Sequence, residues 1–294
     1  MGSSLALWAV ECGARCLSVA GSAGSRQAAA LATRIGARTA DSSELAAAEA
    51  RLVLIAVPDG RIADVARRLA GRHRLGIVLH VSGSLGASVL EPLASSGCRT
   101  GGFHPLRAFP EVEASVERAA GTFFALDGDA EARALGRRLA QAFGGESAVV
   151  GEAQRPLYHW AATLAAGGVV TLLASARSLG TRLGLPAAAL AGYGELARGA
   201  LASALAGTDP GRAITGPAAR GEAETVETHL RALAETAPDL LPMAIELARA
   251  TLARCAEVAP LDAAQKRLAE RLTREDLLDR AKERVLTSTR PNPA

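Results

Sequence analysis

Aromatic side chains are scarce in this sequence. They make up 3% of the 294 residues, although 49% of the residues are hydrophobic. The core must therefore be built mainly from alanine, leucine and valine, with many contacts between small side chains. Charge of one sign is not in excess either, because the formal net charge is +3. A balance this close to neutral does not support a nucleic-acid-binding or membrane-surface protein. A chain of this length can bury a sizeable core and favours two domains over one.

Cysteine is rare as well. The four cysteines, Cys12, Cys16, Cys98 and Cys255, show neither the clustering of zinc ligands nor the spacing of a redox pair. We therefore expect reduced thiols in a cytoplasmic protein. No signal peptide is visible. The apolar run at residues 160–174 comes nearest to a membrane span, but it is short and interrupted by glycine, so it predicts a buried helix of a bundle.

Motifs of hydrolases and metal enzymes are also missing. The sequence has no G-x-S-x-G, no H-E-x-x-H and no clustered pair of carboxylates. These absences leave little support for a hydrolase, and we expect no metal site.

The first half of the chain alternates between strand and helix patterns. Residues 52–57 (LVLIAV) are uniformly apolar and end at Pro58-Asp59-Gly60, which predicts a strand buried on both faces. Further strands are predicted at residues 16–20, 76–81, 98–103, 122–126 and 147–150, and helices at 3–14, 26–35 and 62–71, with a capping box at Asp41 and Glu44 before another short helix. This alternation predicts parallel βαβ units in a doubly wound α/β sheet. The carboxyl ends of its strands border a ligand crevice, so Val57, Pro58 and Asp59 are candidates for one rim of a nucleotide site.

The chain begins on a helix, whereas a dinucleotide-binding domain begins with a strand and a glycine-rich loop. Gly2 resembles the third glycine of G-x-G-x-x-G, so Gly2 and Ser3 are candidate phosphate contacts at a helix N-terminus. The missing strand is normally central, and its absence would leave two strands with unpaired edges. We expect a chain that lacks its first strand, through truncation or a start codon assigned too late. The alternative is a fold that never had this strand and does not bind a dinucleotide.

The loop after the strand at residues 16–20 indicates the choice of cofactor. NAD-selective sites usually carry Asp or Glu there, whereas this chain has Gly21, Ser22, Ser25 and Arg26. Hydroxyl groups and an arginine suit a ribose phosphate, so NADP is preferred over NAD. The alternative is a solvated turn that precedes a helix.

The second half is predicted to be helical. Helices are expected at residues 154–183, 186–205, 225–235, 239–255 and 261–286, with a loop at 213–222 and a frayed tail at 288–294. Gly167 and Gly168 fall inside the first of these helices, where a close helix or ligand contact would compensate their low helix propensity. We therefore predict a dinucleotide-binding domain at 1–152 and an all-α domain at 153–287, with the substrate in the cleft between them.

Several polar residues lie at predicted strand ends or at the domain junction. Ser82 and Gly83 follow a strand that contains His80, and their backbone amides are candidate ligand contacts. His104 follows the next strand and is a candidate general acid or base, as are Tyr158 and His159 in the first turns of the long helix. Adjacent helix positions point about a quarter-turn apart, so we expect one of the last two to face the site. We expect His80 to be a satisfied buried histidine, and a structural role is the alternative for His104.

The loop at residues 213–222 is a second candidate. Arg220, between two glycines, can present a planar fork to a carboxylate or phosphate, and His229 follows in the next helix. The alternative is a helix connector in which Arg220 pairs with Glu222 or Glu224.

Together these motifs identify a resemblance. The sequence is similar to bacterial Rossmann-like proteins whose C-terminal half is a helical domain of unknown function. The similarity rests on V-P-D at residues 57–59, H-x-S-G at 80–83, H-P-L at 104–106, Y-H at 158–159 and I-T-G-P-x-x-R-G at 214–221. It covers nearly the whole chain, and the last motif is the most specific. The family resembles the ketopantoate reductase, phosphogluconate dehydrogenase and pyrrolinecarboxylate reductase group.

The resemblance implies an NADP site, oxidoreductase activity and a helical domain that often forms a homodimer. Two departures from the family pattern stand out. The opening strand and glycine loop are absent, and Gly167 replaces an asparagine that relatives often carry eight residues after the helix histidine.

The leading hypothesis is therefore an NADP-dependent oxidoreductase for a small, anionic substrate. Tyr158 or His159 would handle the proton, and Arg220 would bind the anionic group. The alternatives are a non-catalytic nucleotide-binding or regulatory protein, and a truncated chain that binds no cofactor.

Overall fold

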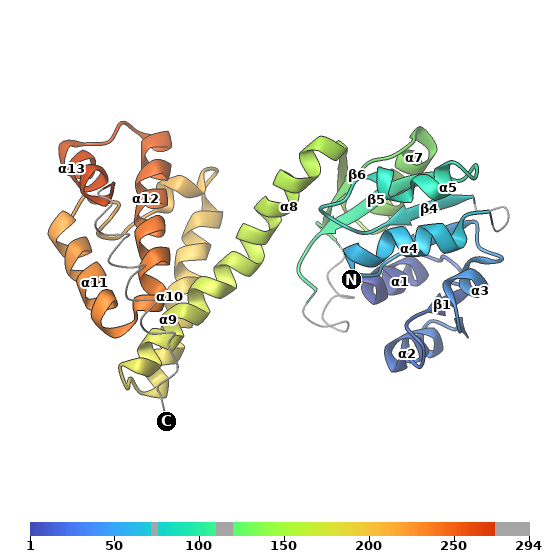
Figure 1. The fold of residues 1–294 in the computed structure, drawn as a ribbon, viewed down its shortest axis with the longest axis horizontal. Coiled ribbons are helices and arrows are strands. Elements are labelled where there is room, and N and C mark those ends of the chain that lie inside the picture. Colours follow the sequence, from blue (N-terminus) through green and yellow to red (C-terminus); the bar gives the residue numbers. More distant parts are fainter. Residues whose placement is uncertain (72–75, 110–119, 274–294) are drawn as a thin grey trace, which may run out of the picture. The chain divides into compact units, whose positions relative to one another are not determined.

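The computed structural model describes residues 1–71, 76–109 and 120–273. The chain forms two compact units, Met1–Gly168 and Val169–Ala294, and each unit has a hydrophobic core of its own (Figure 1). The division at residue 152 that the sequence predicts stays a prediction. The predicted tail at 288–294 lies outside the described residues.

The first unit alternates strands and helices, as the sequence predicts. Its strands are β1 (Ser18–Ala20), β2 (Arg38–Ala40), β3 (Leu52–Ile55), β4 (Ile77–His80), β5 (Arg99–Leu106), β6 (Phe123–Leu126) and β7 (Glu146–Val149). Its helices are α1 (Gly2–Glu11), α2 (Arg26–Arg34), α3 (Ser43–Ala47), α4 (Asp59–Leu69), α5 (Glu91–Ala94), α7 (Ala130–Ala142) and α8 (Arg155–Thr163), with short 3₁₀ turns η1 (Ala87–Leu90) and η2 (Glu152–Gln154).

The strands form two sheets, one with the order β1-β2 and one with the order β3-β4-β5-β6-β7. Neighbours are parallel except β5 and β6, where Leu106 at the end of β5 lies opposite Phe123 at the start of β6. The prediction of a wholly parallel sheet is therefore wrong at β6, because β6 begins beside the point where β5 ends. The class itself, an α/β doubly wound sheet, is confirmed.

The β1-β2 pair and the five-stranded sheet share no strand pairing among the described residues. In the described residues β3 is consequently an edge strand, and Leu52, Val53 and Leu54 are half-buried while Ile55 is buried. The prediction that this strand is buried throughout is wrong for its first three residues, because one edge has no strand beside it.

Helices cover both faces of the five-stranded sheet. On one face, α4, η1 and α5 supply Ile62, Val65, Ala66, Leu69, Leu90 and Leu93 to a core that includes Ile55 and Val78. On the other face, α1 and α7 supply Leu5, Trp8, Ala132 and Ala140 to a core that includes Leu79, Phe103 and Phe124. The two phenylalanines stack with ring centroids 4.7 Å apart. Alternate side chains of β3 and β4 therefore enter different cores, as the period of a strand requires.

Some local predictions need correction. Helix α3 begins after Ser42, whose hydroxyl accepts a hydrogen bond from the Leu45 amide, so the expected Asp41–Glu44 box is not the cap. Helix α4 begins at Asp59, three residues before its predicted start. The strand β2 was not predicted, because Arg38-Thr39-Ala40 contains no apolar run.

A continuous helical run, Glu152–Arg182, passes from the first unit into the second. It contains α8, a π-helical turn (Leu164–Gly168) and α9 (Val169–Arg182). By length and composition alone it could cross a membrane, and none of its most apolar window is buried within the chain. The prediction of a buried bundle helix is therefore wrong for the single chain. Among the described residues a Cβ at Gly167 would meet nothing within 4 Å and one at Gly168 only the Thr163 carbonyl oxygen at 3.6 Å, so the expected close helix contact is not found, and the expected ligand contact stays a prediction.

The second unit contributes helices to the described structure. Its further elements are α10 (Ala187–Ala206), η4 (Pro210–Ala213), α11 (Ala223–Thr236), η5 (Pro238–Leu240), α12 (Leu241–Val258) and α13 (Ala263–Leu272). The core of this unit is formed by α11, α12 and α13 and includes Val226, Leu230, Ile245, Leu252 and Leu268. The predicted all-α character is confirmed, although the end of the predicted helix at 261–286 lies outside the described residues.

Candidate functional site

The carboxyl ends of β3 and β4 lie side by side and are joined by hydrogen bonds. Ser84 donates its hydroxyl to Asp59 Oδ2 at 2.6 Å. The Ser82 hydroxyl accepts hydrogen bonds from the backbone amides of Ser84 and Leu85, at 3.2 and 3.1 Å. The structure thus brings the predicted Val57-Pro58-Asp59 rim against the Ser82-Gly83 turn, because parallel neighbours end at the same edge of a sheet.

The N-terminus of α1 lies at the same edge. A Cβ at Gly2 would be 2.7 Å from the Ala56 Cβ, so only glycine fits this close against the chain that leaves β3. Helix α1 has no side-chain cap, and the buried Ser4 hydroxyl makes no hydrogen bond in the described structure. Ser3 lies beside Gly2 in the first turn. A helix N-terminus with uncapped amides can accept a phosphate group.

The loop between β1 and α2 holds the other predicted cofactor contacts. Gly21, Ser22 and Arg26 are exposed. The Ser25 hydroxyl accepts a hydrogen bond from the Ala28 amide at 3.2 Å and so caps α2. The backbone turns tightly here, since a Cβ at Gly21 would come within 2.8 Å of Ala28 and Ser25. Ser25 therefore serves as a helix cap, as the alternative interpretation of this loop expects.

The predicted acid–base residues form one cluster. His104 lies in β5, which extends past the predicted end at residue 103. Its Nδ1 atom lies 2.9 Å from the Tyr158 hydroxyl. The ring of His159 is perpendicular to that of His104, with centroids 5.8 Å apart. Both helix residues therefore contact His104, although we expected only one to face the site, because the imidazole lies between the two directions in which they point.

Gly83 makes this cluster possible. A Cβ on this residue would lie 2.5 Å from His159 Nδ1 and 2.8 Å from His104 Nε2. Two ring nitrogens thus lie over the Cα atom of Gly83, and His159 Nδ1 is buried without a hydrogen-bond partner in the described residues. The glycine is needed for space rather than for an unusual backbone conformation.

Burial keeps the side chains of His104 and Tyr158 neutral. It lowers the pKa of His104 to about 4, with further lowering by the neighbouring His159 and Arg155 and an opposing effect of Asp59. It also raises the pKa of Tyr158 to about 12, so the phenol keeps its proton near neutral pH. A neutral imidazole that contacts a protonated phenol can pass a proton in either direction.

His80 lies behind this cluster, at the end of β4. Its Nδ1 atom accepts a hydrogen bond from the Ser82 amide at 3.2 Å, so it supports the turn. Burial lowers the pKa of His80 to about 4, and the Arg155 charge adds to this effect. Its Nε2 atom is buried without a hydrogen-bond partner in the described residues, so the expected satisfied histidine is found at Nδ1 alone.

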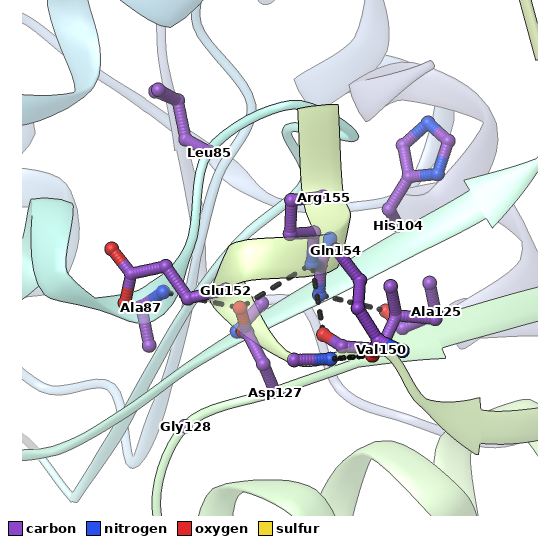
Figure 2. A network of polar contacts seen from close by, with 12 residues as sticks. Leu85, Ala87, His104, Ala125, Asp127, Gly128, Val150, Glu152, Gln154 and Arg155 are labelled. Carbon is purple, nitrogen blue, oxygen red and sulfur yellow. Dashed lines mark hydrogen bonds and ion pairs between the residues drawn. The ribbon is translucent and has the colours of Figure 1, made fainter. Parts of the chain in front are cut away.

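The sequence analysis missed a buried ion pair beneath the turn. Arg155, the first residue of α8, is 0% exposed and lies 3.3 Å from Asp127 Oδ2 through its Nε atom. The guanidinium also donates to the carbonyl of Ser82 (3.1 Å). It donates as well to the carbonyls of Val150 (3.3 Å) and Ala125 (3.4 Å), as Figure 2 shows. Two signals were available in the sequence. An aspartate follows the apolar strand FFAL directly, and an arginine begins an apolar helix.

Arg220 lies in the second unit. It is exposed and donates from Nε to Glu222 Oε1 at 2.5 Å, which is the connector pairing given above as the alternative. Gly221 packs against α13, because a Cβ there would lie 2.5 Å from the Gln265 amide nitrogen. His229 is exposed on α11. The loop therefore has a structural role in the second unit, and Arg220 has a partner that solvent can reach.

Comparisons with known proteins agree with this architecture. Residues 2–105 match the family model of a Rossmann-like domain, and residues 122–251 match the model of a domain of unknown function, DUF2520. The chain joins a Rossmann-like domain to a DUF2520 domain. This confirms the resemblance drawn from the sequence. The search of curated proteins finds no match.

Solved structures share the fold. Protein TM1727 from Thermotoga maritima is 23% identical, with a TM-score of 0.67 over 87% of this chain and 96% of that one. Protein BF3122 from Bacteroides fragilis is 22% identical, with a TM-score of 0.67 over 85% and 93%. A pyrroline-5-carboxylate reductase from Coxiella burnetii is 17% identical, with a TM-score of 0.52 over 88% and 94%.

Proposed function

We propose that this protein is an NADP-dependent oxidoreductase that reduces a small, anionic carbonyl or imine compound. One observation carries the proposal. Tyr158 and His159 lie around His104, over Gly83 and at the edge of a Rossmann-like sheet. That edge is where ligands bind in folds of this class. Among proteins of the same fold, imine reductases from Myxococcus stipitatus were solved with NAD⁺ and with NADP⁺, and a Plasmodium falciparum pyrroline carboxylate reductase with NADP.

The residues at the edge fit a dinucleotide. The uncapped N-terminus of α1 at Gly2 and Ser3 offers amides to a pyrophosphate, and the exposed Ser22 and Arg26 suit a ribose phosphate. Asp59 and the Ser82-Gly83 turn would border the nicotinamide. When bound, the cofactor supplies the hydride.

The chain itself would supply the proton. With its proton on Nδ1, His104 donates to Tyr158 Oη and leaves the phenol proton free for the substrate. As the phenol proton moves to the substrate nitrogen or oxygen, the Nδ1 proton replaces it, and Nε2 gains a proton that solvent supplies on the side of His159, so the imidazole ends as its other neutral tautomer. Each bond that breaks is thereby matched by one that forms, and no charge stays on the buried ring.

Arg220 is the proposed partner of the substrate's anionic group. Its ion pair with Glu222 is exposed, and exposed pairs contribute about 0–1 kcal/mol, so a substrate carboxylate can replace Glu222 at little cost. The planar guanidinium suits bidentate binding of a carboxylate.

The test combines binding and turnover. NADPH binding is measured by fluorescence and calorimetry, and oxidation of NADPH is followed with panels of 2-keto acids and cyclic imines. The proposal expects NADPH binding, turnover of an anionic member of a panel, and a higher KM in Arg220→Ala. Binding without hydride transfer to any compound would favour the non-catalytic alternative, and absence of binding would reject the proposal.

We also propose that the chain forms a homodimer through its helical domain. Large apolar side chains of the second unit are exposed along α9 and α10, among them Val170, Leu172, Leu196, Leu201 and Leu205. An apolar surface of this kind marks an interaction site in a soluble protein. Light scattering after gel filtration would give twice the mass of 30.0 kDa, whereas a monomer in buffer or partition into detergent would reject the dimer.

A further inference from the structure

The buried pair of Arg155 and Asp127 lies next to the candidate site. An arginine that is fully buried is rare, because removing a charge from water costs several kcal/mol unless its partners replace the lost hydration. Here the carboxylate of Asp127 and three backbone carbonyls surround the guanidinium. These contacts fix the guanidinium in place, because its planar set of donors can bind all the acceptors only when each acceptor lies in position.

Two backbone amides also hold the carboxylate of Asp127. Its Oδ1 atom accepts a hydrogen bond from the Gly102 amide at 2.6 Å, and its Oδ2 atom accepts one from the Ala87 amide at 3.1 Å. A Cβ at Gly102 would collide with Asp127 Oδ1 and come within 2.9 Å of Arg155 Nη2. The glycine in β5 therefore leaves the space that the ion pair occupies.

Arg155 belongs to helix α8 and also binds the Ser82-Gly83 turn, which are the two parts of the candidate site. Arg155 lies three and four residues before Tyr158 and His159 on α8, so the three side chains share one face of the helix. The same guanidinium binds the carbonyl of Ser82, the residue before Gly83. The position of the helix face and the position of the turn are thus set by one side chain.

We infer that Arg155 is a positioning residue, held by Asp127, that fixes Tyr158 and His159 of α8 against the Ser82-Gly83 turn. The inference rests on the proposed function, since it assigns this geometry to proton transfer. Displacements of about 1 Å at a reacting centre can cost on the order of 100-fold in rate, so a small loss of order is expected to have a large effect on turnover.

The principal variant is Arg155→Lys, which keeps the charge and loses the fork. We expect kcat to fall on the order of 10- to 100-fold, while the NADPH dissociation constant changes less than about 3-fold. The matched control is Arg249→Lys in the second unit, where Arg249 also binds a carboxylate, Glu246, and a backbone carbonyl, that of Leu272. The control should keep the parent kcat.

A second measurement does not depend on turnover. The NMR titration of His104 in Arg155→Met should move to higher pH, because the variant removes a charge that holds this imidazole neutral, whereas Arg249→Lys leaves the titration unchanged. If the parent chain has no turnover, the proposed function fails, and a nuclear Overhauser contact between the His104 and Tyr158 rings still tests the inference: its loss in a folded Arg155→Lys protein supports positioning by Arg155, and its retention overturns it.

Three further outcomes would overturn the inference. The first is a folded Arg155→Lys protein with the parent kcat, and the second is an unchanged His104 titration in a folded Arg155→Met protein.

If the variants of Arg155 do not fold, Asp127→Asn is used to repeat the kcat measurement, because this variant removes the carboxylate charge and keeps an acceptor for the Gly102 amide. The third outcome is failure of all these variants to fold while Arg249→Lys folds, which would make the pair purely structural.

Discussion

The Nδ1 atom of His104 lies 2.9 Å from the phenolic oxygen of Tyr158, although 54 positions separate the two residues in the sequence. This contact joins a strand of the Rossmann-like sheet to the first turns of α8. It holds a proton donor and its potential proton source in one buried cluster. The first prediction follows directly from it.

Replacement Tyr158→Phe removes the hydroxyl and keeps the ring. We expect kcat to fall on the order of 100-fold, because a positioned general acid contributes roughly 10²–10⁴-fold, with little change in NADPH affinity. Stopped-flow oxidation of NADPH measures the effect. Tyr193→Phe is the matched control, since it alters the only other tyrosine. Turnover in Tyr158→Phe equal to that of the control would exclude the role.

Gly83→Ala tests the space above the turn. The added methyl group would lie 2.5 Å from His159 Nδ1 and 2.8 Å from His104 Nε2, so both rings must move. Overpacking of this kind costs about 1–3 kcal/mol, and we expect a lower melting temperature together with at least about 10-fold lower kcat. Gly199→Ala, where a Cβ meets nothing within 4 Å, is the control and should keep both values. Unchanged activity in Gly83→Ala would mean that the rings are not confined by this contact.

Stability should fall in mild acid. His80 and His104 titrate at about 4 in the folded chain, mainly because of burial, and near 6.5 when exposed. Below pH 6.5 the unfolded chain binds more protons, so the free energy of unfolding decreases as pH falls toward 4. Between pH 7 and 4.5 the loss is on the order of 2 kcal/mol for each histidine. Urea melts across this range measure it, and a His80→Asn, His104→Asn double variant should lose most of the pH dependence. Equal slopes in the parent and the double variant would contradict the assignment.

Cofactor choice can be tested at Arg26. Arg26→Glu should weaken NADPH binding at least about 10-fold and leave NADH binding unchanged, because the ribose phosphate meets a negative charge in place of a positive one. Calorimetric titration with both cofactors gives the ratio. Arg34→Glu, at the other end of α2, makes the same change in charge away from the loop. Equal losses of NADPH and NADH affinity in Arg26→Glu would show that Arg26 does not recognise the ribose phosphate.

Much of the fold could be predicted because it follows from local pattern. The apolar run at β3 and the glycine-bounded helices identify the Rossmann-like half, and the loss of strand patterns after residue 150 identifies the helical half. The antiparallel direction of β6 could not be predicted, because FFAL has the same pattern in either direction. The short β2 could not be predicted either, since Arg38-Thr39-Ala40 is polar and is recognised only through its pairing with β1.

The sequence predicts where the candidate site lies, but it predicts few of the contacts within the site. Residues at the ends of β3, β4 and β5 were expected at one edge, and the structure brings Asp59, Ser84 and His104 there. Arg155 is predicted only as the start of a helix, because its partners Ser82 and Ala125 lie far away in the sequence and only Val150, just after β7, lies nearby. Polar networks of this kind depend on tertiary contacts, which spacing along the chain does not encode.

The separation of the β1-β2 pair from the five-stranded sheet also has a consequence for local unfolding. The β1-β2 ribbon pairs with no other described strand, and its residues are half-buried or exposed, whereas β4, β5 and β6 lie within the five-stranded sheet. Segments with few buried contacts open at lower free energy than core strands. Amide hydrogens of β1 and β2 should therefore exchange with solvent through a local opening that leaves those of β4 and β5 protected. The part of the domain proposed to bind the ribose phosphate would then unfold independently of the part that carries His104.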